Sequence, residues 1–298
     1  MINNYRIRGI LVAFAFILPT FLGLAIFYYY PFVQNIINSF LEIDYFDNVV
    51  GWVGLSNYKE VLNNEHLSHS IIFTMKYAIV TTVLSVVLSL LFAIALNKNI
   101  KGVGIYRVLF YLPVIAMPIA IIAIWKWIFN YDFGFANAIL VSMGFVGVPW
   151  LRESDALFFV IVLIGVWGRV GYNMIIIYAG LQNIPTLYYE AAKIDGANAV
   201  SRFFNITIPM ISPTLFFVTV LTTISSLQVF ESIYGLITAN TKVAQESSTV
   251  IYTFFEYAFV NNRKGVASAL SVIFLIIILI ITIIQFVLQK YWVHYDQN

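Results

Sequence analysis

Long apolar runs alternate with short polar segments along this chain. Six of the runs hold about 20 or more mostly apolar residues, which is enough for a helix to cross the hydrocarbon core of a bilayer. Because backbone polar groups in lipid must be hydrogen-bonded within the spanning segment, we expect each run to form an α-helix. The predicted spans cover residues 10–30, 71–96, 106–128, 156–181, 212–237 and 266–288.

The composition also indicates that the chain lies in a membrane. Of 298 residues, 61% are hydrophobic and only 10% are charged, which is too little charge to cover a water-exposed surface. The first apolar run follows Arg6 and Arg8, but it is too long for a secretory signal and no small-residue cleavage site ends it. We therefore predict an all-α integral membrane protein with six transmembrane helices, forming a single transmembrane domain over residues 1–298.

The distribution of charge predicts the orientation. An even number of spans puts both termini on one side of the membrane, and cytoplasmic loops are rich in Lys and Arg. The loops opposite the termini carry five basic residues and ten acids. The side of the termini carries three acids, Glu190, Asp195 and Asp296, against eight basic residues: Arg6, Arg8, Lys98, Lys101, Arg107, Lys193, Arg202 and Lys290. Both termini are therefore predicted to be cytoplasmic, together with residues 182–211.

A polar interruption between the fourth and fifth spans, residues 182–211, is the most distinctive part of the chain. Helix formers dominate residues 186–199, and Gly196 offers a turn, so we expect two short helices with a bend. Ala191 and Ala192 leave a nearly bare helix face that a partner could approach closely, while Glu190 and Asp195 supply charge around it. This face suits docking into a groove of another protein.

The same segment resembles the cytoplasmic signature of permease subunits of binding-protein-dependent ABC importers. That signature reads Glu-Ala-Ala, three residues, Gly, nine residues, Ile, one residue, Leu-Pro, and Ile208 replaces its leucine here. The runs 127–140, 179–195 and 228–234 are also similar to carbohydrate permeases of the maltose and glycerol-phosphate-uptake type. The positions that match the signature or flank it are Glu190, Ala191, Ala192, Asp195, Gly196, Ile206 and Pro209.

The resemblance implies a type I ABC importer permease fold in a bacterial-type cell (inner) membrane. It also implies a second, homologous permease subunit, two cytoplasmic ATPase subunits and an extracytoplasmic solute-binding protein. Residues 182–211 would then be the coupling segment that docks on an ATPase subunit. The chain has no Gly-rich Walker sequence with its lysine, so ATP and Mg are expected on the ATPase subunit, and no cofactor on this chain.

Polar residues inside apolar spans are candidates for a substrate path, because a charge at the bilayer centre is costly unless it faces protein or water. Arg169 and Asn173 lie in the fourth predicted span, and Gln228, Glu231 and Tyr234 recur every three residues in the fifth, on one helix face. We expect all five to line the path. In the alternative interpretation, Arg169 pairs with Glu231, or with a carboxylate of the partner permease, to fix helix packing.

Taken together, the sequence predicts a transport subunit that moves a sugar, an oligosaccharide or a related polyol across the membrane. The nearest alternative keeps the architecture but imports a polyamine, a phosphate ester or an amino acid. A membrane enzyme is disfavoured by the lack of a nucleophile or a metal motif, since the chain has no cysteine and its His66 and His69 lack a carboxylate partner. A purely structural scaffold leaves the signature unexplained. The net charge of +2 is small, so no nucleic acid is expected as a partner.

Overall fold

The computed structural model describes residues 2–98, 101–237 and 241–294, most of them helical. Asp296, which entered the charge count above, lies outside the described residues. The chain forms two compact units, one of residues 1–64 with 254–273 and one of residues 65–253 with 274–298, and each is described by itself. The prediction of one transmembrane domain stays a prediction.

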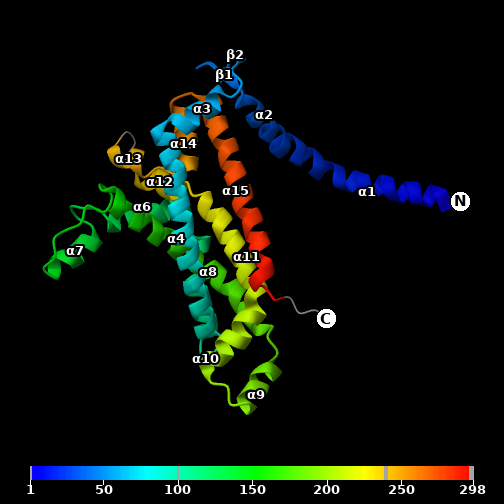
Figure 1. Ribbon diagram of the computed structural model, residues 1–298, viewed down its shortest axis with the longest axis vertical. Coiled ribbons are helices and arrows are strands. Elements are labelled where there is room, and N and C mark those ends of the chain that lie inside the picture. The colour runs from blue at the N-terminus through cyan, green and yellow to red at the C-terminus, as the bar shows by residue number, and fades with distance from the viewer. Residues whose placement is uncertain (1, 99–100, 238–240, 295–298) are drawn as a thin grey trace. The chain divides into compact units, whose positions relative to one another are not determined.

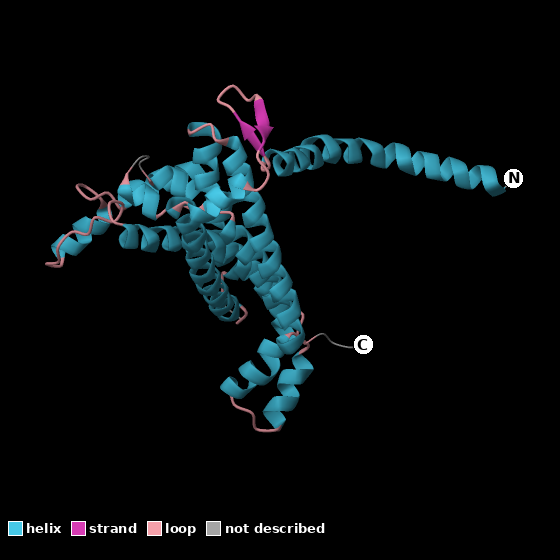
Figure 2. Ribbon diagram, turned by 45° about the horizontal axis from the view of Figure 1, so that its top comes forward, coloured by secondary structure: helices cyan, strands magenta, loops and turns pink. Residues whose placement is uncertain are grey.

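The first unit begins with an apolar helical rod made of α1 (Ile2–Leu24), the π-helical η1 (Ala25–Tyr29) and α2 (Tyr30–Asn38). An antiparallel hairpin follows, with β1 (Leu41–Ile43) and β2 (Val49–Trp52), drawn in magenta in Figure 2. Helix α3 (Ser56–Asn63), the π-helical η3 (Glu256–Val260) and the first turns of α15 (Lys264–Trp292) complete this unit.

Polar side chains hold the first unit together. The amide of Asn57, which is 9% exposed, donates to the carbonyl oxygens of Ser39 and Leu41 at 3.0 and 2.9 Å. Arg263 forms a bidentate ion pair with Glu60, and hydrogen bonding to this carboxylate raises the pKa of the guanidinium. These contacts fasten the α3 region to the start of α15.

Three long helices make the frame of the second unit, namely α4 (Glu65–Leu96), α8 (Ser154–Gln182) and α11 (Ile208–Leu227) (Figure 1). Small polar residues bury well at helix contacts in membranes, because they let backbones approach and can hydrogen-bond across the contact. Ser89 of α4 donates to the carbonyl of Val170 in α8 at 3.0 Å, and Asn173 of α8 donates to Thr222 of α11 at 2.9 Å. The fourth predicted span, residues 156–181, lies within α8, and the second, residues 71–96, lies within α4.

The third predicted span, residues 106–128, is not a continuous helix. It is divided into α5 (Val103–Ile115) and α6 (Pro118–Ile128), whose axes differ by 96°. The reason is Pro118, because a proline disfavours the α conformation in the residue before it, and Met117 has the extended angles φ −63° and ψ 121°. The chain therefore has five helices able to span a membrane, or six if this bent pair counts as one span, within its described ranges.

The fifth predicted span, residues 212–237, is also wrong at both ends. A helical run of α10 (Ala199–Arg202), the π-helical η2 (Phe203–Thr207) and α11 ends at Leu227, and a separate short helix, α12 (Glu231–Leu236), follows. The hydroxyl of Thr249 donates to the carbonyl of Val229 at 3.0 Å, which satisfies a backbone group freed by the break. Gln228, Glu231 and Tyr234 consequently do not share one helix face.

The remaining elements of the second unit are short. Helix α7 (Phe135–Ser142) lies in the segment between the third and fourth spans, and α9 (Thr186–Ile194) lies in the coupling segment. Helices α13 (Lys242–Glu246) and α14 (Val250–Phe255) precede α15, and α14 and α15 each have residues in both units. The last predicted span, residues 266–288, lies within α15.

The crossing of α5 and α8 generates a stability prediction. A Cβ at Gly171 would overlap the carbonyl oxygen of Phe110, whereas a Cβ at Gly168, on the same helix, would meet nothing within 4 Å. We expect Gly171→Ala to destabilise the folded protein by about 1–3 kcal/mol. The matched control Gly168→Ala should be neutral or slightly stabilising, since Ala is the better helix former. Thermal unfolding of the two purified variants checks this, and equal midpoints would refute the close crossing.

Candidate functional site

The coupling segment is a two-helix turn at one end of the second unit, where Figure 1 shows α9 and α10 beyond the long helices. Asp195 caps α9, the N–H of Gly196 bonds to the carbonyl of Lys193, and the N–H of Ala197 bonds to the carbonyl of Ala192. This is the Schellman motif, in which the residue after the cap must be left-handed. Gly196 has φ +77°, so the predicted pair of short helices with a bend at Gly196 is confirmed.

Side-chain caps and one cross-link give this turn a defined shape. The side chain of Asn198 accepts from the N–H of Ser201 at 2.8 Å and so caps the start of α10. The hydroxyls of Tyr189 in α9 and Thr207 in η2 lie 3.0 Å apart and are hydrogen-bonded. The coupling segment is thus connected to the helical run that leads into α11.

The coupling segment also exposes large apolar side chains that no described part of the chain covers. Leu187 is 71% exposed, Ile194 87% and Val200 65%. Exposed apolar side chains clustered on an ordered element mark an interaction site. None of the three was predicted from the sequence as an interaction residue, although each lies within residues 182–211.

The signature residues themselves divide into two groups. Glu190, Ala191 and Asp195 are exposed on α9 or at its end. Ala192, Ile206 and Pro209 are half-buried, and the last two lie at the join of η2 and α11. The first group is therefore available to a partner, and the second group is partly covered within the chain.

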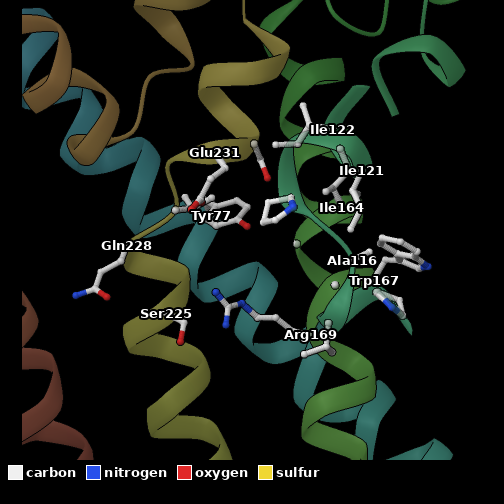
Figure 3. Close-up of a pocket in the computed structure, with 17 residues that line it drawn as sticks. Tyr77, Ala116, Ile121, Ile122, Ile164, Trp167, Arg169, Ser225, Gln228 and Glu231 are labelled. Atoms are coloured by element: carbon white, nitrogen blue, oxygen red, sulfur yellow. The ribbon is translucent and has the colours of Figure 1, made fainter. Parts of the chain in front are cut away.

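A second feature, a cavity of about 300 Å³ in the second unit, contains three of the predicted path residues, Arg169, Gln228 and Glu231. Figure 3 shows Arg169 extending from α8 toward α11, where Ser225 lies. The buried Tyr77 of α4 also lines it. The bend between α5 and α6 forms one wall, made of Pro113, Val114, Ala116 and Pro118.

Arg169 and Glu231 share this cavity without forming an ion pair. The ion pairs in the part of the chain that the structure describes include Arg152 with Asp132, Lys242 with Glu246, Arg263 with Glu60 and Lys264 with Asp47. A half-buried guanidinium in a membrane segment is costly unless it meets water or a polar group. The cavity supplies that access, so Arg169 can offer its donors to a solute.

Asn173 and Tyr234 lie outside this cavity. Asn173 is 2% exposed, and its side-chain amide donates a hydrogen bond to the hydroxyl of Thr222, which joins α8 to α11. Tyr234 is 49% exposed and stacks on Phe230, with ring centroids 5.4 Å apart. Tyr77, Ser225 and Ser232 also line the cavity and were not predicted from the sequence. Pro118 is the residue from which the α5–α6 bend could have been predicted, because proline disfavours the α conformation in the residue before it.

Lys126 of α6 forms a hydrogen bond to another helix of the second unit. Its ammonium group donates to the carbonyl of Gly235 at 3.1 Å, which joins α6 to α12. Beside it, the rings of Trp125 and Trp167 meet edge to face with centroids 5.6 Å apart. Within the described residues, no group of three His, Asp or Glu side chains is placed to hold a metal ion.

The fold and these two features define a helical membrane permease with a docking segment on one end. Residues 85–292 match the family described as the binding-protein-dependent transport system inner membrane component, and the chain belongs to this family. It is therefore a transport subunit and not an enzyme, as the sequence predicted, and it is a multi-pass membrane protein.

Three relatives show how far the similarity extends. YesP of Bacillus subtilis (strain 168), named a probable ABC transporter permease protein, is 37% identical over 97% of this chain and 93% of its own length. UgpA of Agrobacterium fabrum, an sn-glycerol-3-phosphate transport system permease, is 31% identical over 96% and 97%. AraP of Bacillus subtilis (strain 168), an arabinooligosaccharides transport system permease, is 31% identical over 91% and 86%.

A solved structure shows the same fold. A bacterial ABC transporter involved in the import of the acidic polysaccharide alginate contains a chain that superposes with a TM-score of 0.86. The two chains are 19% identical, and the match covers 98% of this chain and 99% of that one. The predicted fold class, an ABC importer permease, is confirmed.

Proposed function

We propose that this chain is the membrane-spanning permease subunit of an ATP-driven importer for a sugar, an oligosaccharide or a related polyol. The observation that carries the proposal is the coupling segment, a rigid turn whose Leu187, Ile194 and Val200 are exposed. A segment of this kind suits docking on a soluble ATPase subunit. The family and the permease relatives named above support the transport role.

The proposal includes an assembly and an orientation. A second homologous permease completes the path, two ATPase subunits carry ATP and Mg, and an extracytoplasmic binding protein delivers the solute. Both termini and the coupling segment face the cytoplasm, in line with the excess of basic residues there. The family's dependence on a binding protein supports the delivery step.

The mechanism is alternating access driven through the coupling segment. ATP binding draws the ATPase subunits together and carries α9 and α10 with them. One end of the segment continues into α8, which holds Arg169, and the other continues into α11, which holds Ser225. Rigid-body movement of packed helices is an established way to open a site between them.

The cavity offers groups that match a carbohydrate. Arg169, Gln228 and Ser225 can hydrogen-bond to sugar hydroxyls, and the ring of Trp167 offers a surface for C–H faces. Arg169 and Glu231 line the same cavity and interact electrostatically, so their opposite charges offset each other and suit a solute that presents neutral hydroxyl groups. A phosphate ester such as a glycerol phosphate is the second candidate solute, supported by the similarity to UgpA of Agrobacterium fabrum.

Substitutions at Gly196 test the coupling role. A Cβ there would meet nothing within 4 Å, so the φ of +77°, not space, requires glycine. We expect Gly196→Val to cost about 1–2 kcal/mol in the turn and to abolish uptake without preventing membrane insertion. Gly196→Asn should keep more uptake, because Asn tolerates the left-handed conformation. Uptake by Gly196→Val at the wild-type rate would disprove the coupling role.

Substitutions in the cavity test the substrate path. In the reconstituted complex with its binding protein, ATP hydrolysis is measured against neutral sugars, acidic sugars, sugar phosphates, amines and amino acids. We expect Arg169→Gln and Glu231→Gln to raise the solute concentration needed for stimulation roughly tenfold to hundredfold, by loss of about 1–3 kcal/mol of hydrogen bonding. Tyr234→Phe, outside the cavity, is the matched control.

The panel separates the two parts of the proposal. Stimulation by a saccharide, weakened in both cavity variants and unchanged in Tyr234→Phe, supports the path and the solute class. Stimulation only by an amine or an amino acid would keep the importer and overturn the sugar assignment. Wild-type behaviour of both cavity variants would show that the solute passes elsewhere.

A further inference from the structure

A second cavity, of about 520 Å³, lies between the coupling segment and the ends of α4 and α8. Its volume is in the range of known ligand pockets, about 300–1,000 Å³. Its walls come from α4, α8, α9, α10 and η2 and from the residues just past α4. The described lining residues are Ile94, Asn97, Lys98, Leu181, Tyr189, Lys193, Ala199, Arg202, Phe203 and Thr207. We call it the basic pocket.

Three cations meet in the basic pocket with no acid among its described lining residues. Lys98 follows the end of α4, Lys193 lies in the last turn of α9, and Arg202 ends α10. None of the three belongs to an ion pair described above. Like charges held around one space repel each other, and this repulsion is stronger beside a low-dielectric wall. The pocket therefore has a strong electrostatic preference for an anion.

The remaining groups in the basic pocket are suited to a phosphate. Arg202 is half-buried, and its planar fork of N–H donors matches phosphate oxygens, while the two ammonium groups act as point charges. Asn97 adds an amide, and the bonded hydroxyls of Tyr189 and Thr207 lie on another wall. Glu190 and Asp195, the acids of the same segment, are not among the lining residues.

We propose that the basic pocket binds a phosphate group and thereby ties α9 and α10 to the end of α4. One phosphate between Lys98, Lys193 and Arg202 replaces their mutual repulsion with attraction. Two sources share this chemistry, a soluble phosphate-bearing molecule and the headgroup of an anionic phospholipid. Both have access, because the pocket lies past the ends of two spanning helices, where basic pockets are known to take headgroups.

The site is independent of the solute that the permease moves. Its three cations belong to the coupling segment and to the end of α4, whereas Arg169 and Glu231 line the other cavity. Occupation would restrain the segment that contacts the ATPase. Failure of the sugar assignment therefore leaves the basic pocket intact, and failure of phosphate binding leaves the transport role intact.

Thermal unfolding of the purified full-length chain tests the proposal in two arms. One arm adds inorganic phosphate in detergent at an ionic strength matched with potassium chloride. The other compares nanodiscs of phosphatidylcholine with nanodiscs that also contain phosphatidylglycerol. Ligands that bind the folded state raise the unfolding midpoint, and we expect a rise of about 2–4 °C in at least one arm.

Variants then assign the shift to the basic pocket. Lys98→Gln and Arg202→Gln should lose most of the rise, whereas Lys101→Gln should keep it, because Lys101 is three residues from Lys98 but does not line the pocket. If Arg202→Gln fails to fold, the exposed Lys98 decides the test. A rise with inorganic phosphate identifies the soluble source, and a rise only with phosphatidylglycerol identifies the lipid.

Two results would overturn the proposal. The first is the absence of a rise in both arms for the wild-type chain. The second is a rise of equal size in the wild type and in Lys98→Gln, or its loss in Lys101→Gln as well, since either pattern would indicate general charge screening and no defined site.

Discussion

The requirement that every backbone polar group in lipid be hydrogen-bonded governs the rest of this structure. Long unbroken helices meet it by themselves, and α4 and α8 are of this kind. Where a helix is interrupted, either another residue hydrogen-bonds to the freed backbone group or the interruption lines a cavity. The break before Pro118 borders the Arg169 cavity, and Thr249 compensates the break after Leu227. Broken helices at membrane depth are tolerated where they line a cavity, which is where this chain has them.

The two functional features share the same helices. Helix α8 carries Arg169 in its middle and ends three residues before α9, while the run from Ala199 to Leu227 begins in the coupling segment and ends beside Gln228 in the cavity. A displacement of the coupling segment therefore moves two walls of the cavity, α8 and the end of α11, at the same time. Hydrogen bonds between α8 and α11, such as that of Asn173 with Thr222, make the two helices move together.

Hydropathy and turn chemistry predicted the existence of the spans and the bend at Gly196, because both depend on local composition. They did not predict where helices stop inside apolar sequence. Residues 228–237 remain apolar enough to continue a span, yet the chain breaks there and contacts Thr249, a residue distant in sequence. Asn173 was expected in the path because it is polar, but Thr222 satisfies it. Pairing of polar groups between helices cannot be read from one helix alone.

The sidedness of the coupling segment is the central claim, and the absence of cysteine makes it directly measurable. A single cysteine is introduced as Ile194→Cys in the coupling segment or as Val146→Cys between the third and fourth spans, at sites 87% and 86% exposed. A membrane-impermeant maleimide should label Val146→Cys in intact cells, and Ile194→Cys only in inverted vesicles from cells that lack the ATPase subunits. Labelling of Ile194→Cys in intact cells would contradict a cytoplasmic coupling segment, and with it the account of how ATP drives transport.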